Sequence, residues 1–422
     1  MIKADVASYI NQIIHIIPWE GSYTYSKRGN RWYFIKAWAS LLYNTYKTIK
    51  RYGISYQKPA PGRTVVFYVE SQNQYNSLRP IIDRFKDDSV VIRHPWLKIG
   101  HAASEVPLAV IYILAVLFYP FTFFQARKLF PIYEGKFNKN HILVYGALGM
   151  AGYVISRRLL KAAEARMVVV SNDHLFIPVS MIYAARERHM KSVYVQHAHV
   201  SPAFPPLCMD YALLDGTVAE RTYRRIGVGK DTTIALIGMM KSDGLVRYKK
   251  VSGIRNVGIC INGVDDLSKI DAMIRHIHEY HPDLNIHVRL HPIMPKDYHM
   301  DSFAFCTMSD HRGENVFAFL KRIDLLVCGE SSVHVEAALM NMPSFYYNTF
   351  HRLLDDYGFV KDGLVSALFD DPRRFSDYLA TLDVNQDFSG RAKPYCDTIG
   401  TAYENRSTER AIVEINGILG KS

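Results

Sequence analysis

Short runs of valine, isoleucine and leucine alternate with helical patterns along most of this 422-residue chain. The runs lack polar alternation, which is typical of strands that are buried on both faces. Strands that alternate with helices form parallel sheets covered by helices on both sides. The chain is also too long for one compact core and suits two domains of roughly 200 residues each. We therefore expect an α/β protein with two doubly wound parallel-sheet domains.

The expected elements fall into two series. In the first series, strands are predicted at 63–70, 89–93, 140–146, 167–172, 192–197, 209–214 and 232–237, and helices at 75–86, 150–164, 177–189 and 217–226. In the second, strands are predicted at 256–261, 285–290, 302–306, 324–328 and 343–347, and helices at 265–280, 314–322, 332–341 and 372–381. The series separate near 238–252, so we divide the chain into an N-terminal domain, 1–238, and a C-terminal domain, 239–422.

The net charge of the chain limits the kinds of partner that it is expected to bind. Lysine and arginine total 51 against 40 aspartate and glutamate, which gives a formal net charge of +11. Such a surplus favours polyanionic partners: nucleic acid, anionic lipid or phosphorylated substrates. The five cysteines form no CxxC pair, which argues against a zinc ribbon or a disulfide scaffold and favours reduced thiols in the cytosol. The first residues also lack the basic-then-apolar order of a signal peptide.

Two stretches have the composition of membrane contacts. The uncharged segment 106–124 is just long enough to span a bilayer as a helix. It can be a buried helix with an apolar loop, a monotopic or re-entrant contact, or a true span. The segment 27–52 mixes basic and aromatic residues, which is typical of an interfacial helix on anionic lipid. The same segment also fits a solvated helix packed by its aromatics, or a single-stranded nucleic-acid site, although no RRM or KH signature accompanies it.

Polar residues follow several of the predicted strands. Because ligands of parallel sheets gather at the carboxyl ends of strands, these residues are candidates for a site. After strands of the first series they are Asp173, His174, His197, His199, Gly238, Lys241 and Asp243, and after strands of the second series they are His291, Glu330, Ser331 and Ser332. Imidazoles, hydroxyls and helix starts in two facing domains indicate a cleft that binds a phosphorylated donor.

Some of these residues are suited to bind the donor. Ser331 and Ser332 open a helix whose free N–H groups and dipole attract an anion, unless one of them is simply the N-cap. Glu336 lies four residues after Ser332 on the same helix face and is suited to accept hydrogen bonds from a ribose or to capture a lysine.

The histidines are suited to acid–base chemistry. His291 stands between a strand and Pro292, where an imidazole can donate a hydrogen bond to a leaving phosphate. His197 ends a strand beside a proline-rich loop and is suited to be the general base for an acceptor hydroxyl near pH 7. His199 and Asp173 are alternatives for that base. Each histidine can instead be a structural imidazole with satisfied hydrogen bonds.

Several common signatures are missing from the sequence. There is no GxGxxG after the first strand, no GxxxxGK[ST] and no HExxH. Asp265-Asp266 and Asp370-Asp371 stand at predicted helix starts, so no clear DxD metal motif follows a strand. We therefore expect a reaction that needs no metal and no cofactor.

Four motifs in a fixed order resemble those of the GT-B glycosyltransferase superfamily: YVQHAHVS, IGMMKSD, VRLHP and DLLVCGESSVHVEAAL. The resemblance covers roughly residues 140–345. It is strongest to bacterial polymer transferases that use cytidine nucleotides, including teichoic-acid CDP-glycerol and CDP-ribitol phosphotransferases, polysialyltransferases and capsule Kdo transferases. The positions that match the family motifs are His197, with Ala198 in place of a Gly, then Gly238, Lys241, Asp243, His291, Pro292, Ser331 and Ser332.

The resemblance implies two Rossmann-like domains facing across a cleft and a metal-independent transferase with a CMP- or CDP-linked donor. It implies catalytic roles for His197, His291, Asp173 and His199, and nucleotide or phosphate binding by Gly238, Lys241, Ser331, Ser332, Glu336 and Arg289. The N-terminal domain would hold a glycan or lipid-linked acceptor at the cytoplasmic face of the inner membrane, on anionic lipid, in capsule, teichoic-acid or lipopolysaccharide synthesis. No nucleic-acid partner is expected. The alternatives are a UDP-sugar-dependent GT-B transferase or epimerase, and a non-catalytic membrane-associated binding protein.

Overall fold

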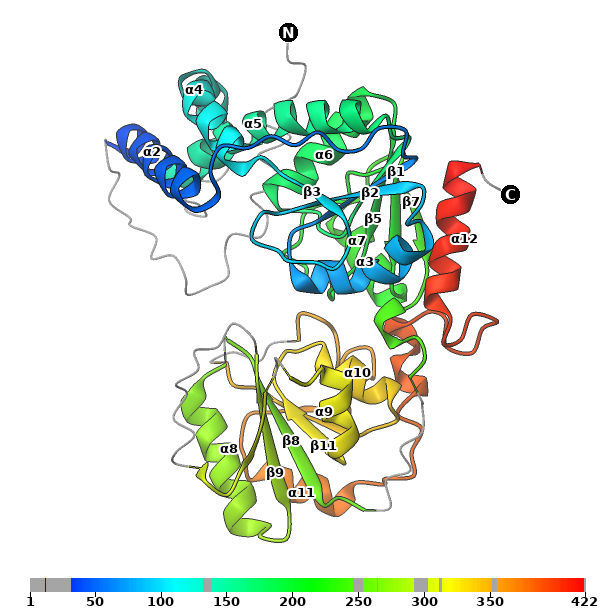
Figure 1. Cartoon of the computed structure of the whole chain (residues 1–422). Coiled ribbons are helices and arrows are strands. Elements are labelled where there is room, and N and C mark those ends of the chain that lie inside the picture. Colours follow the sequence, from blue (N-terminus) through cyan, green and yellow to red (C-terminus); the bar gives the residue numbers. More distant parts are fainter. Residues whose placement is uncertain are drawn as a thin grey trace. The chain divides into compact units, whose positions relative to one another are not determined.

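The computed structural model describes Gln12 and residues 32–131, 139–245, 253–263, 265–291, 303–310, 313–350 and 355–420. The chain divides into two compact units (Figure 1). The first unit comprises Met1–Leu214, Glu220–Lys241 and Thr408–Ser422, and the second comprises Asp215–Ala219 and Ser242–Ser407. The basic positions Lys27, Arg28 and Arg31, the residue Pro292 and part of the expected domain break, 246–252, lie outside the described residues.

The first unit contains a seven-stranded sheet in the order β3-β2-β1-β4-β5-β6-β7, and all of its strand pairs are parallel. Its strands are β1 (Val65–Val69), β2 (Ser89–Arg93), β3 (Ala103–Glu105), β4 (Met167–Val170), β5 (Lys191–Val195), β6 (Tyr211–Leu214) and β7 (Thr233–Leu236). Every residue of β1 and β4 is buried, as expected for apolar strands covered on both faces. The strand order reverses between β1 and β4, which is where doubly wound sheets bind ligands.

The second unit repeats this plan with a six-stranded parallel sheet in the order β10-β9-β8-β11-β12-β13. Its strands are β8 (Asn256–Ile261), β9 (Asn285–Leu290), β10 (Thr307–Ser309), β11 (Leu325–Cys328), β12 (Ser344–Tyr347) and β13 (Leu368–Phe369). Here the order reverses between β8 and β11. The prediction of two doubly wound parallel-sheet domains is confirmed.

Helices connect the strands and cover the sheets. Those described before the second sheet are α2 (Tyr33–Tyr52), α3 (Gln72–Arg84), α4 (Leu108–Ala126), α5 (Lys139–Ala163), α6 (Phe176–Glu187) and α7 (Thr217–Ile226). Those that follow are α8 (Leu267–Tyr280), α9 (Val316–Arg322), α10 (Val333–Leu339), α11 (Arg374–Thr381) and α12 (Ser407–Leu419). Side-chain caps fix three of the starts, because Ser71, Asp266 and Asn315 each accept a backbone N–H at the first turn of α3, α8 and α9.

The C-terminal helix α12 belongs to the first unit, although it follows the whole second unit in sequence (Figure 1). Its residues Ala411, Ile415 and Leu419 are buried in the same core cluster as Phe67 of β1 and Val169 of β4. The expected division at 238 and 239 leaves out this return of the chain, because residue order alone does not show which sheet a terminal helix covers.

Two strand predictions are wrong. Residues 140–146 are not a strand but the first turns of α5, where Ile142, Leu143 and Gly146 are buried at helical spacing. A short apolar run of this kind does not distinguish a strand from a helix that is buried on most sides. The strand expected at 302–306 lies instead at β10, Thr307–Ser309, and Cys306 donates its backbone N–H to Phe303 in the turn before it.

Candidate active site

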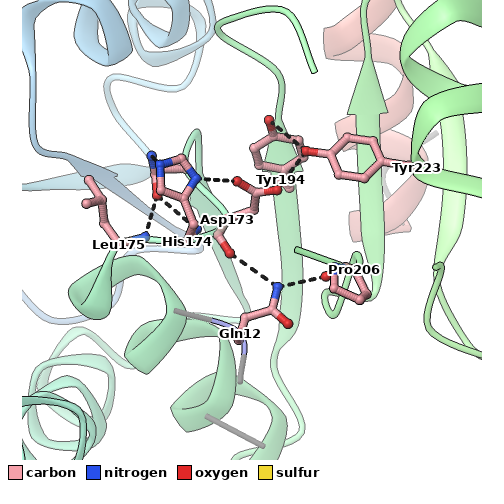
Figure 2. A network of polar contacts seen from close by, with 8 residues as sticks. Gln12, Asp173, His174, Leu175, Tyr194, Pro206 and Tyr223 are labelled. Carbon is pink, nitrogen blue, oxygen red and sulfur yellow. Dashed lines mark hydrogen bonds and ion pairs between the residues drawn. The ribbon is translucent and has the colours of Figure 1, made fainter. Parts of the chain in front are cut away.

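The turn after β4 is held by one side chain. Asn172 Oδ1 accepts the backbone N–H groups of His174 (3.0 Å) and Leu175 (2.7 Å). This local capping competes with continued strand geometry and ends the strand. It also starts α6 directly after the turn and projects the side chains of Asp173 and His174 from the carboxyl end of a central strand (Figure 2).

Asp173 and His174 form a hydrogen-bonded pair in this turn. The Nδ1 atom of His174 lies 2.8 Å from Oδ1 of Asp173, and Asp173 Oδ2 accepts the hydroxyl proton of Tyr223 at 2.7 Å. Tyr223 in turn contacts the hydroxyl of Tyr194 at 3.4 Å (Figure 2). Asp173 is buried, whereas the His174 side chain is 17% exposed. A buried carboxylate that holds one ring nitrogen leaves the other oriented for proton transfer.

The opposite ring nitrogen of His174 has a neighbour of its own. Nε2 lies 3.1 Å from Nδ2 of Asn172. Because Asn172 uses its oxygen for two backbone N–H groups, it presents its amide N–H to the ring. His174 then carries its proton on Nδ1, toward Asp173, and keeps Nε2 as an acceptor. The Asn172 amide occupies that acceptor position, so an incoming hydroxyl must displace the amide before Nε2 can act as a general base.

Glu70 stands at the end of the neighbouring central strand. The β1–β4 register pairs Tyr68 with Val170, so Glu70 follows β1 at the level where the Asn172 turn follows β4. Its Oε2 accepts the hydroxyl proton of Tyr68 at 3.1 Å. Burial raises the pKa of Glu70 from 4.5 to about 7, although the Tyr68 hydrogen bond and the charge of His174 both lower it. A carboxyl that changes protonation near neutral pH therefore lies close to the Asp173–His174 pair.

The structure places His197 near this pair, and both predicted histidines of the first unit are buried near Lys241. Burial, the charge of His174 and that of Lys241 lower the pKa of His197 to about 4, while Asp173 raises it. Burial followed by the charge of Lys241 lowers the pKa of His199 to about 3. Both imidazoles are therefore neutral at pH 7. The buried Nδ1 atom of His197 has no hydrogen-bond partner among the described residues.

Gly238 and Lys241 reach the same end of the sheet from β7. Gly238 has a φ of 74°, a left-handed conformation that favours glycine. It turns the chain into the 3-10 segment Met240–Ser242, which carries Lys241. His197 is thus within electrostatic reach of Asp173, His174 and Lys241, and His199 is within reach of Lys241.

In the second unit, the switch point between β8 and β11 is tightly packed. Asp265 follows β8 and accepts the N–H of Asn262 (2.6 Å) and the hydroxyl of Thr349 (2.9 Å). A Cβ at Gly329, directly after β11, would lie 2.9 Å from Oδ1 of Asp265. The Asp265 carboxylate therefore packs directly against the backbone at Gly329.

The predicted residues Ser331 and Ser332 follow Gly329 at the start of α10. Ser332 is the N-cap residue, but its side chain makes no capping hydrogen bond, while Ser331 Oγ accepts the N–H of Val333 at 3.4 Å. Glu336 is buried on the same helix. The neighbouring Glu330 accepts the N–H of Tyr357, and burial raises its pKa to about 8.

The other two predicted residues of this unit lie at the end of β9. His291 donates its backbone N–H to Ile261 of β8 at 2.9 Å, so it lies at the same sheet edge as Ser331, with β8 between them. Strands spaced about 4.8 Å apart put β9 and β11 roughly 10 Å apart. Arg289 donates to Ser309 Oγ (2.6 Å) and to the Glu314 carbonyl (2.8 Å), so its guanidinium already has partners in the protein. The roles of these residues in nucleotide binding stay predictions.

Sequence reasoning missed Glu70 and Tyr223, and it interpreted Asp265 only as a helix-start residue. None belongs to a motif, and two of them become significant only through the strand register or through a hydrogen bond across the unit. Glu70 is the last residue of the first predicted strand, and ligands of parallel sheets bind at the carboxyl ends of strands. Among the described residues, no group of three or more His, Cys, Asp or Glu side chains could hold a metal ion. The expectation of a metal-independent reaction is not tested by this observation.

No known protein family and no curated protein matches the chain in sequence. Solved structures do match it. The co-structure of S. aureus MnaA with UDP has a TM-score of 0.57 at 12% identity and covers 85% of this chain and 98% of that one. A structure of the wall teichoic acid polymerase TagF soaked with CDPG has a TM-score of 0.51 at 13% identity and covers 92% of this chain and 99% of that one.

A UDP-GlcNAc 2-epimerase from Methanocaldococcus jannaschii, in complex with UDP-GlcNAc and UDP, has a TM-score of 0.52 at 13% identity, covering 84% of this chain and 99% of that one. Likeness at such low identity defines the fold and no more. Together with the two parallel sheets, it shows that this chain has the two-domain GT-B fold, as the motif resemblance predicts.

Proposed function

We propose that this protein is a glycosyltransferase, or a polyol-phosphate transferase, that uses a nucleotide-activated donor. The observation that carries the proposal is the buried Asp173 that orients His174 at the carboxyl end of β4. In this role an acceptor hydroxyl displaces the Asn172 amide from His174 Nε2, which then takes the hydroxyl proton as that oxygen attacks the donor. Asp173 stabilises the imidazolium that forms. His197, with a pKa near 4, holds a proton too weakly at neutral pH to be the preferred base.

The second unit is the proposed donor-binding unit. Ser331 and Ser332 would contact the donor phosphates, His291 would donate to the leaving group, and Glu336 would accept from a ribose. In the first unit, Lys241 would add positive charge near the reacting groups. Arg289 would act at a distance, by holding the β9 end in place through Ser309 and Glu314.

The proposed donor is linked to CMP or CDP, and the proposed product is a bacterial capsule, teichoic-acid or lipopolysaccharide chain. The sequence motifs support this choice, and so does the likeness to a teichoic acid polymerase that covers 92% of this chain. The acceptor would be a glycan or a lipid-linked primer, and the reaction would need no metal.

An epimerase is the second candidate. It is favoured by the UDP-GlcNAc 2-epimerases among the similar structures, which cover 83–86% of this chain. A carboxyl such as Glu70, with a pKa of about 7, is suited to both proton removal and proton return at a sugar carbon. An epimerase forms its product without any acceptor, whereas a transferase does not.

The test is a thermal-shift panel with CMP, CDP, UMP, UDP and GDP, followed by NMR of UDP-GlcNAc incubated with enzyme alone. A ligand at about 100 times its dissociation constant stabilises the folded state by about 2.7 kcal/mol. A response to cytidine nucleotides only supports the proposed transferase. A response to uridine nucleotides with acceptor-free conversion of UDP-GlcNAc supports the epimerase. No response to any nucleotide contradicts both.

A further inference from the structure

We propose that α2 and α4 together form a docking surface for the face of an anionic lipid bilayer. The inference does not depend on the proposed transferase activity. It starts from α4, the one described helix that is long and apolar enough to cross a membrane. One stripe of α4, including Ala115, Tyr119 and Thr122, is buried. The opposite stripe is not: Leu117 is 67% exposed and Phe121 is 69% exposed.

Helix α2 exposes a second apolar stripe. Ile35, Trp38, Leu42 and Tyr46 recur at helical spacing and are all exposed, as are Trp32 and Tyr43 beside them. The opposite side of α2, with Ala37, Leu41 and Thr48, is buried. More than half of the exposed large hydrophobic side chains in the described part of the chain lie on α4, on α2 or at Trp32. Such a concentration marks an interaction surface and not a random scatter.

The two helices lie side by side (Figure 1), and the contacts between them show that they run antiparallel. Near the start of α2, the carbonyl of Phe34 accepts the hydroxyl proton of Tyr119 at 2.7 Å, and the Phe34 ring packs on Phe123. Further along α2, Thr45 Oγ1 donates to the carbonyl of Tyr112 at 3.4 Å. The two exposed stripes therefore lie on neighbouring helices of the first unit, and together we call them the α2/α4 surface.

Basic side chains accompany the apolar ones on the α2/α4 surface. Lys36, Lys47, Lys50 and Arg51 are exposed on α2, and Arg127 and Lys128 follow α4. No Asp or Glu occurs within 32–52 or 106–131. Aromatic and aliphatic side chains that enter the bilayer interface, accompanied by cations that meet the lipid headgroups, are the pattern of a monotopic contact.

The packing of α4 argues against a transmembrane span, and the charge of the α2/α4 surface argues against a second copy of the chain as its partner. A transmembrane span would require α4 to leave Phe34, Thr45 and the core that buries Tyr119. A second copy of the chain would set basic residues against basic residues across a two-fold axis, which is unfavourable. With α4 lying in the interface plane, the apolar side chains would enter an anionic bilayer and the basic side chains would meet its headgroups.

The test is flotation of the full chain with vesicles of phosphatidylcholine and phosphatidylglycerol, compared with phosphatidylcholine alone. The protein should float with the anionic vesicles, and added salt should weaken the binding because it screens the charges. The double variant Leu117→Asp, Phe121→Asp should bind these vesicles roughly tenfold or more weakly. Its melting temperature should stay unchanged, because both side chains are exposed in the fold.

The control is Val413→Asp on α12, which introduces an aspartate at another exposed apolar residue of the first unit and should bind vesicles like the native chain. The charge variant Lys47→Glu, Lys50→Glu should lose binding to anionic vesicles in the same assay. A native protein that does not float with anionic vesicles overturns the proposal. So does a Leu117→Asp, Phe121→Asp variant that floats normally, or one that changes only the oligomeric state in light scattering.

Discussion

Asp173 and His174 are adjacent in the chain and yet hydrogen-bond to each other, with Nδ1 and Oδ1 2.8 Å apart. The turn capped by Asn172 makes this contact possible, because it bends the backbone so that both side chains leave on the same side. The second carboxylate oxygen is held by Tyr223. Both carboxylate oxygens of Asp173 are thus hydrogen-bonded, which keeps the His174 imidazole oriented before any substrate binds.

Replacing His174 should abolish most of the transfer activity. A general base typically contributes about 10²–10⁴-fold, so His174→Ala should lower turnover by at least about two decades. Asp173→Asn should cost about as much, since the amide no longer holds the Nδ1–H form. Tyr223→Phe removes one hydrogen bond and leaves the carboxylate, so its loss should be under roughly tenfold. Turnover is measured with the nucleotide donor that stabilises the protein. Full activity in His174→Ala would assign the base to another residue.

The buried Glu70 should make stability depend on pH. Unfolded Glu70 ionises near 4.5, whereas in the folded chain its pKa is about 7. Above pH 4.5 the unfolded state gains by ionising, so the native protein loses stability up to about pH 7, by about 3 kcal/mol at 1.36 kcal/mol per pKa unit. Glu70→Gln cannot ionise and should be more stable than the native protein above pH 7.

The urea midpoint of both proteins, measured below pH 4.5 and above pH 7, checks this prediction. The two midpoints should agree in acid and separate in alkali. Glu164→Gln, at an exposed carboxyl of the same unit, should follow the native curve throughout. A constant gap at both pH values would instead mean that the substitution acts through packing.

Nucleotide binding should depend on the ends of β9 and β11. If His291, Ser331 and Ser332 contact the donor phosphates, then His291→Ala and the double variant Ser331→Ala, Ser332→Ala should each reduce the thermal shift caused by nucleotide. Each lost hydrogen bond to a charged phosphate is worth roughly 1.5–3 kcal/mol, or about tenfold or more in affinity. Thr381→Ala on the exposed end of α11 serves as the control. Unchanged affinity in both variants would remove these residues from the site.

Gly258 should resist substitution for reasons of packing. It lies in β8, where an added Cβ would overlap the Ile323 side chain and lie 3.0 Å from the Phe319 ring, and both neighbours are fully buried. Overpacking a core of this kind costs about 1–3 kcal/mol, which should lower the melting temperature of Gly258→Ala. Gly417→Ala is the matched control: it lies on α12 with nothing within 4 Å of the added Cβ, and should gain about 0.5–1 kcal/mol.

Much of the fold follows from the sequence pattern because the strands are buried on both faces. The predicted ranges of β2, β8, β9 and α7 match the structure residue for residue, since in each case turn residues or charges border the apolar pattern. The run at 140–146 lacked such borders, and it continues without interruption into α5. Its helical state depends on packing between α4 and α6, which no local pattern encodes.

The candidate site was only partly predictable. Asp173, His197 and Lys241 follow strands and were found in that way, and the structure places them near one another. Glu70 needed the β1–β4 register, and the preference for His174 over His197 needed the hydrogen bonds of Asn172 and Asp173. Burial, which separates a neutral His197 from an oriented His174, is a property of the assembled unit.

Helix α12 fills the first unit's core with Ala411, Ile415 and Leu419. During translation, these side chains emerge from the ribosome only after every residue of the second unit has been synthesised. Until α12 is synthesised, part of the apolar surface of the nascent first sheet therefore stays uncovered. Chaperones would be expected to bind to this state. A nonsense mutation at codon 408 would leave that surface permanently open and should send the product to proteolysis.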